Sequence, residues 1–195
     1  MVAMLESLKN YHVVLASNSP RRRELLAGLG IDFEVRVLPG IDESYPENLP
    51  VVDIAQYIAT KKAAAYDVAV DELLITADTV VIVDDLVLGK PHNTDEASRM
   101  LHLLSGRTHQ VVTGVCLRTR SCEHSFAVTT DVAFKVLTEE EIMHYVSVYK
   151  PFDKAGAYGI QEWIGFIGVT GLHGSYFNVM GLPVQRIYTE LEHVL

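Results

Sequence analysis

The residue of this sequence that most needs a chemical explanation is Asp78, which lies inside the long apolar segment 73–83. Its neighbours are expected to be buried, and an unpaired carboxylate in such surroundings is energetically costly. Two explanations remain open. Asp78 either ends a strand and caps the following turn, or it is a metal ligand or general base at the carboxyl end of a strand, where open α/β sheets place their ligands.

Lys62 is a second charged residue in an apolar setting. It follows Ile58, Ala55 and Val51 by four, seven and eleven residues, so the helical period places it on the apolar stripe of a helix. A lysine in that position either extends its amine to solvent or meets an anion.

Residues 17–23, with the sequence Ser-Asn-Ser-Pro-Arg-Arg-Arg, join an expected strand to an expected helix. Hydroxyl groups, the free N–H groups of a helix start and guanidinium groups all bind phosphate oxygens. The segment is either an anion cradle or a solvated basic helix start. The chain has no Walker motif, no His-x-His or His-Glu-x-x-His spacing and no Gly-x-Ser-x-Gly turn, which argues against a P-loop protein, a metallohydrolase and a serine hydrolase.

Residues 153–161 combine charged side chains, glycines and an amide with no regular period. Glycines in such a stretch let the backbone approach a ligand closely, and a plain irregular loop is an equal alternative.

The elements that must position these residues alternate between strand and helix patterns. Short apolar or alternating runs predict strands, and apolar residues at helical spacing between capping signals predict helices. In the last strand, alternate residues from Phe126 to Val136 share one face. The mixed order predicts an α/β or α+β sheet with helices on its faces, and no change in composition marks a linker, so one domain spanning residues 1–195 is expected. The expected strands are 13–15, 33–37, 73–83, 86–88, 109–118 and 126–136. The expected helices are 21–27, 51–65, one ending near Leu104 with Asn93 as its N-cap and Glu96 three residues later, one opened by a capping box of Thr138 with Glu141 and running to about 148, and a C-terminal helix with Pro183 in its first turn.

The charge of the chain argues against a nucleic-acid partner. Its 195 residues include 16 Lys and Arg against 25 Asp and Glu, a formal net charge of −9 that repels a phosphodiester backbone. No run approaches the roughly 18 apolar residues of a membrane helix, and the first residues lack a signal-peptide pattern. A cytoplasmic protein with no membrane partner is expected, and its two cysteines, Cys116 and Cys122, are expected to be unpaired thiols.

Short motifs that occur in a recognisable order extend over nearly the whole chain. The most specific is Asp-Lys-Ala-Gly-Ala-Tyr-Gly-Ile-Gln at 153–161. The others are at 15–22, 41–43, 62–63, 77–80, 90–91, 104–109, 113–114, 174–178 and 181–183. Together they resemble the Maf family of nucleoside triphosphate pyrophosphatases.

The resemblance implies cleavage of a nucleoside triphosphate between its α and β phosphates, giving a nucleoside monophosphate and pyrophosphate, with Mg²⁺ or Mn²⁺ as cofactor. By family position, Asp78 is the general base or water-positioning carboxylate, and Glu43 and Asp78 hold the metal. The residues implied to bind the substrate are Ser17, Arg21, Arg22, Lys62 and Lys90.

The choice of base is implied by three positions. In the family, the residues equivalent to Arg21, Thr79 and Gln161 separate a subgroup acting on dTTP and UTP from one acting on 7-methyl-GTP, and this chain resembles the dTTP/UTP subgroup. A Gln amide can pair with the donor and acceptor edge of uracil or thymine. One departure is Trp163, since relatives more often have small residues there, and a bulky side chain could reshape the base pocket.

The resemblance also implies an elongated, twisted mixed sheet flanked by helices, with a cleft between two lobes, similar to the inosine triphosphate pyrophosphatases. Family members are often homodimers. The implied role is housecleaning of the nucleotide pool, with modified uridine triphosphates as further substrates. Two alternatives remain: a non-enzymatic, nucleotide-binding regulator of cell division, and a pyrophosphatase for another base such as 7-methyl-GTP.

Overall fold

The computed structural model describes residues 3–195, with side chains from Glu6 onward, and its helices and strands alternate along the chain. The elements are α1 (Ala3–Leu8), β1 (His12–Leu15), α2 (Pro20–Ala27), β2 (Glu34–Val35), η1 (Val51–Asp53), α3 (Ile54–Ala64), β3 (Glu72–Val83), β4 (Leu86–Leu88), α4 (Thr94–Leu104), β5 (Thr108–Arg118), β6 (Glu123–Phe134), α5 (Glu139–Tyr149), η2 (Ala155–Ala157), α6 (Trp163–Gly168), β7 (Val169–His173), α7 (Tyr176–Met180), α8 (Val184–Glu190) and η3 (Leu191–His193).

The strands of the described chain form one mixed sheet of seven strands. Their order is β2-β1-β3-β5-β6-β7, and β4 pairs with β3 outside this path. Strand β1 runs parallel to both β2 and β3, whereas the β3–β4 and β6–β7 pairs are antiparallel. The predicted mixed α/β class, with helices flanking a mixed sheet, is confirmed.

The chain divides into two compact units, each built from segments far apart in sequence. The first unit comprises Met1–Asp78, Thr113–Val128 and Gly181–Leu195, and the second comprises Thr79–Val112 and Thr129–Met180. The single domain of residues 1–195 stays a prediction.

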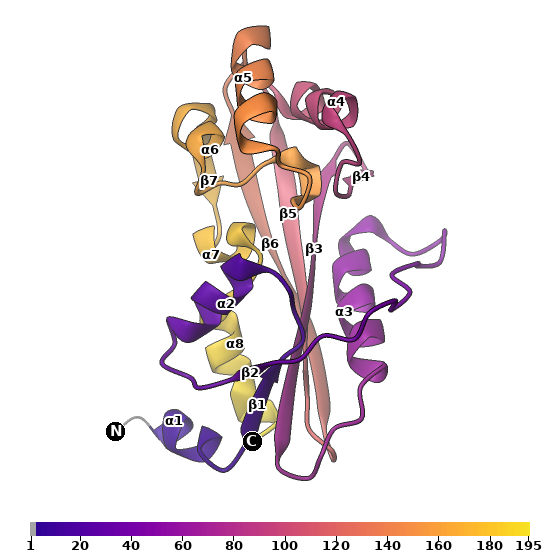
Figure 1. The fold of residues 1–195 in the computed structure, drawn as a ribbon, viewed down its shortest axis with the longest axis vertical. Helices are drawn as coiled ribbons and strands as arrows, with labels where there is room; N and C mark the ends of the chain where they lie inside the picture. The colour runs from indigo at the N-terminus through magenta and orange to yellow at the C-terminus, as the bar shows by residue number, and fades with distance from the viewer. Residues whose placement is uncertain (1–2) are drawn as a thin grey trace. The chain divides into compact units, whose positions relative to one another are not determined.

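The core of the first unit is the contact between α3 and three strands. Val14 of β1, Leu74 of β3 and Cys116 of β5 pack against Ala59 and other apolar side chains of α3. Figure 1 shows α3 on one side of these strands and α2 and α8 on the other. Side chains buried on both faces explain why the strand sequences are continuously apolar rather than alternating.

The second unit has its own core, in which α4, α5 and α6 cover strand residues such as Val83 and Val132. Both capping predictions are confirmed: Asn93 accepts a hydrogen bond from the Glu96 N–H at the start of α4, and Thr138 forms a capping box with Glu141 at the start of α5.

Two strand predictions were wrong in extent. The strand expected at 33–37 is reduced to Glu34–Val35, an exposed edge of two residues. The strand expected to end at Val136 ends at Phe134, and Val136 is 76% exposed rather than on the face it was predicted to share. The alternation of faces holds up to the end of the strand, where Thr130, Val132 and Phe134 are all buried, and Val136 departs from it because it lies beyond that end.

Two helix predictions need smaller corrections. The helix expected at 51–65 begins as the 3₁₀ turn η1 and continues as α3, and the C-terminal helix α8 begins at Val184, directly after Pro183, and is followed by η3. Elements α1, η2, α6, β7 and α7 were not predicted, because all are short and carry no sustained period.

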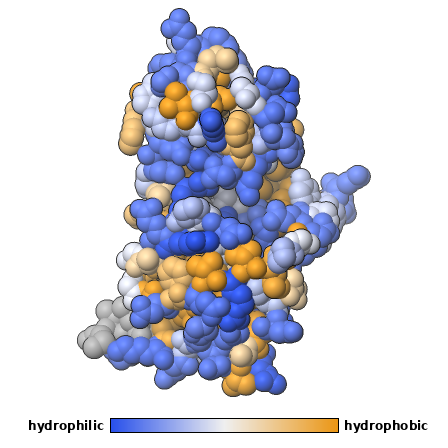
Figure 2. Space-filling model, viewed as in Figure 1, coloured by the Kyte–Doolittle hydropathy of each residue, from blue (hydrophilic) through white to orange (hydrophobic). Residues whose placement is uncertain are grey.

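The surface in the view of Figure 2 is mostly hydrophilic, with separate apolar patches. Phe166, in the second unit, is a large apolar residue that is 77% exposed. Among the described residues, no helix has the length and apolar character needed to span a bilayer. Both cysteines are free thiols, as predicted, and burial raises the pKa of Cys116 to about 12.

Candidate functional site

Lys62 is held between two carboxylates in the first unit. Its Nζ lies 2.8 Å from Asp78 Oδ1 and 2.8 Å from Glu43 Oε1. The side chains of Lys62 and Asp78 are each 15% exposed, whereas that of Glu43 is 55% exposed. The contact explains both sequence anomalies together, because each nearly buried charge has the other as its partner.

The position of Lys62 follows from the way α3 packs. Residues Ile58, Ala59 and Ala63 are buried on the sheet, which confirms that Lys62 lies beside the apolar stripe of this helix. Two hydrogen bonds hold the helix against the strands. The Thr76 hydroxyl of β3 donates to the Ala59 carbonyl at 2.7 Å, and Arg118 of β5 donates to the Ala63 carbonyl at 2.7 Å.

Asp78 is accessible for a reason that differs from the predicted one. It does not end its strand, because β3 continues to Val83. The parallel neighbour β1 ends instead: Leu15 is the last paired residue, opposite Ile75, and the Ala16 N–H makes one more bond to the Ile75 carbonyl. Asp78 therefore lies just beyond the carboxyl end of the adjacent parallel strand, which is where such sheets bind ligands.

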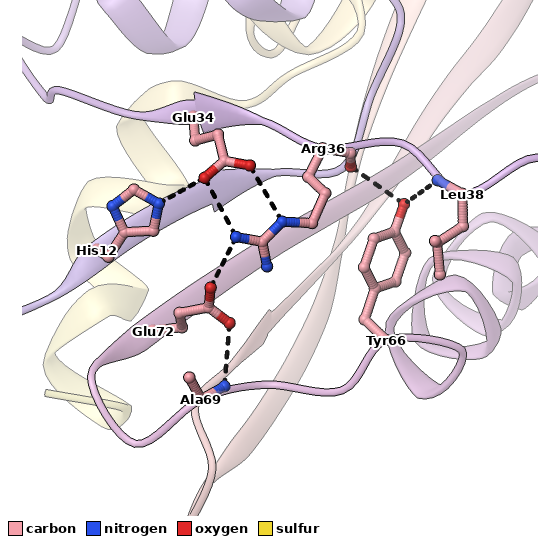
Figure 3. A network of polar contacts seen from close by, with 7 residues as sticks. All are labelled: His12, Glu34, Arg36, Leu38, Tyr66, Ala69 and Glu72. Atoms are coloured by element: carbon pink, nitrogen blue, oxygen red, sulfur yellow. Dashed lines mark hydrogen bonds and ion pairs between the residues drawn. The ribbon is translucent and has the colours of Figure 1, made fainter.

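Glu43 lies in a long irregular segment after the two-residue strand β2, and a polar network anchors the start of that segment (Figure 3). Arg36 bonds both oxygens of Glu34 at 3.1 Å and reaches Glu72 at 2.8 Å. Hydrogen bonds from Arg36 and from a backbone N–H lower the pKa of Glu72. The Tyr66 hydroxyl donates to the Arg36 carbonyl at 3.2 Å and accepts from the Leu38 N–H at 3.0 Å.

Lys61 fixes the same segment next to Glu43. Its Nζ lies 2.7 Å from Asp42 Oδ2 and donates to the Ser44 carbonyl at 2.8 Å. The Lys61 amine, together with the Ser44 hydroxyl and N–H, lowers the pKa of Asp42. Adjacent lysines thus have different tasks: Lys61 holds the segment, and Lys62 meets the carboxylates. Sequence reasoning missed the role of Lys61, although its position beside Lys62 was visible.

Arg22 connects three segments of the first unit. Its Nε donates to the Gly181 carbonyl at 2.8 Å, and its Nη1 donates to the Ala77 carbonyl at 2.9 Å. The same Nη1 lies 3.5 Å from the hydroxyl of Ser17, which is buried. Burial lowers the pKa of Arg22, and the neighbouring charge of Arg21 acts in the same direction while that of Asp78 opposes it. The loop before α2 is therefore held beside the strand residue that precedes Asp78.

Arg21 lies in α2 of the first unit and is half-buried, whereas Thr79, Lys90 and Gln161 belong to the second unit. Thr79 follows Asp78 in β3 and is half-buried, and Lys90 is exposed just after β4. Gln161 is half-buried, and its Oε1 is enclosed without a hydrogen-bond partner among residues 3–195. The Gly156 N–H donates to the Gly89 carbonyl at 3.0 Å, which brings the 153–161 segment next to the residue that precedes Lys90.

A second charged cluster holds the 153–161 segment, with two of its residues near the start of the segment and one directly after Gln161. Lys154 is 8% exposed, and its Nζ lies 2.7 Å from Asp153 and 3.0 Å from Glu162. The Tyr145 hydroxyl donates to Glu162 and accepts from the Gly159 N–H. Sequence reasoning missed this cluster, whose signal was the lysine within the motif and the acidic residue directly after it.

Trp163 packs within the second unit. It begins α6, lies edge-on to His144 with ring centroids 4.9 Å apart, and packs against the apolar core of this unit. These contacts give the bulky side chain a structural role.

A mixed α/β fold that holds a lysine between two carboxylates, beside a half-buried arginine and the loop before a helix, has the groups that proteins use to bind anions and divalent cations. Comparison with known proteins identifies the class more closely. A family model described as "Maf-like protein" matches residues 12–194. The chain belongs to the Maf family, as its motifs predicted.

Curated relatives cover almost the whole chain. A Phocaeicola vulgatus protein named "dTTP/UTP pyrophosphatase" is 63% identical over 191 residues, 97% of this chain and 99% of its own. A Parabacteroides distasonis protein of the same name is 59% identical, over 97% of this chain and 100% of its own. A solved HAM1 protein from Coxiella burnetii matches 94% of this chain and 99% of its own at 15% identity and a TM-score of 0.47, which is too low to support an argument.

Proposed function

We propose that this protein is a nucleoside triphosphate pyrophosphatase that hydrolyses dTTP and UTP to the nucleoside monophosphate and pyrophosphate. The structural observation that carries the proposal is the convergence of Glu43 and Asp78 on Lys62, each at 2.8 Å. The names of the relatives, at 59–63% identity over 97% of this chain, support the substrate class.

The phosphate groups of the substrate need positive charge and hydrogen-bond donors. Lys62 supplies a charge beside Asp78, and a triphosphate competes with Glu43 and Asp78 for that amine. Ser17 lies in the loop before α2 and Arg21 in the first turn of that helix, and hydroxyl and guanidinium groups favour phosphate oxygens. Arg22 is a positioning residue as well as a source of charge, because its guanidinium bonds two backbone carbonyls. Lys90, a substrate-binding residue by family position, is an exposed cation of the second unit.

A divalent cation fits the carboxylate pair. Glu43 and Asp78 already converge on one cationic group, and Mg²⁺ or Mn²⁺ is commonly held by one or two carboxylates together with substrate phosphates. When bound, the metal would neutralise charge on the phosphates. The Glu43 side chain is the more exposed of the two, so it can change partner without leaving a buried group unsatisfied.

Asp78 is the group placed to take a proton from the attacking water. Its carboxylate is 15% exposed, which leaves it open to solvent on one side, and Lys62 occupies Oδ1. Water adds across the phosphoanhydride between the α and β phosphates, and the bond to the pyrophosphate leaving group breaks. Catalysis of this kind depends mainly on positioning and electrostatic stabilisation.

The base preference is assigned to Arg21, Thr79 and Gln161. The Gln161 Oε1 is enclosed and has no hydrogen-bond partner in the described chain, as expected of an amide whose partner is a group of the substrate. Uracil and thymine have a ring N–H donor beside carbonyl acceptors. The carbonyl oxygen of an amide can accept from that N–H while its NH₂ group donates to a neighbouring carbonyl. A base without that edge would leave the amide unsatisfied and would be rejected.

The test is a panel assay of the purified protein with Mg²⁺ or Mn²⁺. Both pyrophosphate and monophosphate are measured for dTTP, UTP, modified uridine triphosphates, ATP, GTP and 7-methyl-GTP. We expect equimolar products from dTTP and UTP well above the purine nucleotides. Preferential cleavage of 7-methyl-GTP would overturn the base assignment, and absence of pyrophosphate from every nucleotide would favour a nucleotide-binding regulator.

A variant pair tests the role of Lys62. In Lys62→Met the apolar stem is kept and the charge is lost, so we expect kcat/KM for dTTP to fall by about 10²-fold or more. Lys9→Met is the matched control, because Lys9 pairs with Glu6 on an exposed surface of α1. Equal activity of both variants would remove Lys62 from the site.

The proposed activity fits a cytoplasmic protein that clears nucleotides from the pool and needs neither nucleic acid nor a membrane. A homodimer, as is common in the family, stays a prediction.

A further inference from the structure

The C-terminal end of the first unit holds a cluster of imidazole and carboxylate groups that the proposed reaction does not use. Glu190 ends α8, His193 ends η3, and His124 lies near the start of β6. His124 Nε2 lies 2.5 Å from Glu190 Oε2, and His193 Nε2 lies 3.4 Å from the same oxygen. The three ligand atoms all lie within 4.8 Å of one another.

The sequence positions explain why the groups converge. Glu190 and His193 are three residues apart in a helical segment, so their side chains lie on the same side. The ring of His124 lies against that of His193, with centroids 4.8 Å apart. The Cys122 thiol donates to the His193 carbonyl at 3.5 Å, which ties the start of β6 to the C-terminal turn.

Burial distinguishes this cluster from an ordinary surface ion pair. The Glu190 side chain is only 6% exposed, whereas those of His124 and His193 are 31% and 61% exposed. The carboxylate is therefore fixed in the protein, and the two imidazoles leave a path from solvent.

The second carboxylate oxygen of Glu190, Oε1, is held by an arginine. Arg186 Nε lies 2.5 Å from Glu190 Oε1, one turn earlier in α8. Burial acts to raise the pKa of Glu190, but the hydrogen bond from His124 and the charges of Arg186 and the imidazoles lower it overall. A carboxylate held on one oxygen presents the other as a single ligand atom, as hydrogen-bonded partners do around metal sites.

We propose that His124, Glu190 and His193 bind one Zn²⁺ ion through Nε2, Oε2 and Nε2. A tetrahedral Zn²⁺ site with bonds of about 2.0–2.1 Å places its ligand atoms about 3.3 Å apart. The His193–Glu190 separation of 3.4 Å already matches this edge, and the His124–Glu190 contact of 2.5 Å opens by less than an ångström. Two histidines and one carboxylate are an established zinc ligand set, and water completes it.

The bound ion would fasten the C-terminal segment to β6. His124 belongs to one of the strands of the first unit, whereas Glu190 and His193 belong to the last described turn of the chain. The site shares no residue with Glu43, Lys62 and Asp78, so it is independent of the proposed catalytic activity. A ligand that binds only the folded chain raises its stability.

The test uses the full chain after removal of metals with a chelator. Co²⁺ is titrated in excess Mg²⁺, which occupies the oxygen ligands at Glu43 and Asp78, and the visible absorption of tetrahedral Co²⁺ is recorded. We expect saturation at one equivalent, displacement by one equivalent of Zn²⁺, and a higher melting temperature with Zn²⁺. Binding should weaken at pH 5.5, since protonated imidazoles cannot bind metal.

Variants separate this site from the rest of the molecule. His193→Asn and His124→Asn should each weaken Co²⁺ binding at least tenfold, with unchanged circular dichroism and Mg²⁺-dependent turnover. His12→Asn is the matched control, because His12 contacts the Glu34 carboxylate at 2.7 Å in an exposed pair without a second imidazole.

Three results would overturn the proposal. These are no saturable binding by the wild-type protein, undiminished binding by both His193→Asn and His124→Asn, or loss of the cobalt spectrum in Asp78→Asn together with its retention in His193→Asn. The last result would place the ion at the carboxylates of the proposed catalytic site.

Discussion

The charges of Asp78 and Lys62 stabilise each other at 2.8 Å, in a place where neither side chain is more than 15% exposed. In the proposed reaction, an incoming triphosphate would offer Lys62 a second anionic partner and would free the carboxylate oxygen of Asp78. The contact between Lys62 and Asp78 therefore stabilises the fold without substrate, and in the proposed reaction both groups turn to the bound substrate. Glu43 supplies the second carboxylate, so removal of Asp78 does not leave the lysine without an anion.

Asp78→Asn is expected to reduce kcat for dTTP by about 10²–10⁴-fold, the usual contribution of a positioned general base. The substitution keeps the shape of the side chain, and Lys62 keeps its contact with Glu43, so folding and nucleotide binding should persist. Pyrophosphate release and equilibrium binding of dTTP measure the two effects separately. Asp67→Asn, at an exposed position after α3, is the control, and an unfolded Asp78→Asn protein would mean that the carboxylate is structural.

The residues of the site could be predicted from their types, but several of their contacts could not. Asp78 and Lys62 were visible because each breaks an apolar pattern of known period. The contact of Lys62 with Glu43 was not predictable from pattern, because residues 36–50 are irregular and a period cannot place them. The backbone contacts of Arg22 were also hidden, since they depend on carbonyls 55 and 159 residues away.

At the scale of elements, the longer helices and the long strands were predicted well, whereas short elements such as α1, α6 and α7 were not. Capping residues such as Thr138 act within a few residues of sequence, so their effect is readable locally. Strand β2 has two residues, and its position depends on pairing with β1, where Glu34 lies opposite Val14. The end of β1, which exposes Asp78, is likewise a property of pairing rather than of the Asp78 segment itself.

Gly114→Ala is expected to destabilise the first unit and reduce activity together. A Cβ at Gly114 would lie 2.2 Å from the Gln56 N and 2.3 Å from the Ala55 carbonyl oxygen, both backbone atoms of α3. The helix must move to admit it, at a cost of about 1–3 kcal/mol in unfolding free energy, and Lys62 moves with that helix. Urea unfolding and dTTP turnover measure the two effects, and Gly89→Ala, where nothing lies within 4 Å of the new Cβ, is the control.

Tyr66→Phe is expected to loosen the segment that carries Glu43. The variant loses a donor to the Arg36 carbonyl and an acceptor for the Leu38 N–H, at about 1 kcal/mol in unfolding free energy. The concentration of Mg²⁺ needed for half-maximal activity should rise, while kcat at saturating Mg²⁺ should change little. An unchanged Mg²⁺ requirement would show that the network in Figure 3 does not position Glu43.

At the scale of the whole molecule, both units pair a nearly buried lysine with carboxylates: Lys62 with Asp78 in the first and Lys154 with Glu162 in the second. The second unit also buries His109, which is 1% exposed, between Tyr158 and Phe134. Its Nε2 lies 2.7 Å from the Tyr158 hydroxyl, and its Nδ1 has no partner among the described residues. Protonation of this ring in the folded state is therefore strongly disfavoured.

Burial lowers the pKa of His109 to about 4, from an ordinary value of 6.5. Between these pH values the unfolded chain binds a proton that the folded chain does not, so the free energy of unfolding falls as pH falls from 6.5 towards 4. The full loss for this group is about 3 kcal/mol. His102, whose pKa is raised by hydrogen bonds to Ser98 and Glu139, acts in the opposite direction, so only a comparison of variants isolates His109.

His109→Gln removes the titrating ring and keeps an acceptor for the Tyr158 hydroxyl. Urea unfolding of the wild type and the variant at pH 5.0, 5.5, 6.0 and 6.5 should give a difference in unfolding free energy that shrinks as pH falls, because only the wild type is destabilised through His109. Glutamates such as Glu72 and Glu141 have a pKa below the ordinary value of 4.5 in the folded chain. The chosen pH range lies above that value, so these glutamates contribute little to the slope. His173→Gln, whose side chain is 95% exposed, should leave the slope unchanged. Parallel pH profiles for His109→Gln and the wild type would show that His109 takes up its proton in the folded state as readily as in the unfolded one.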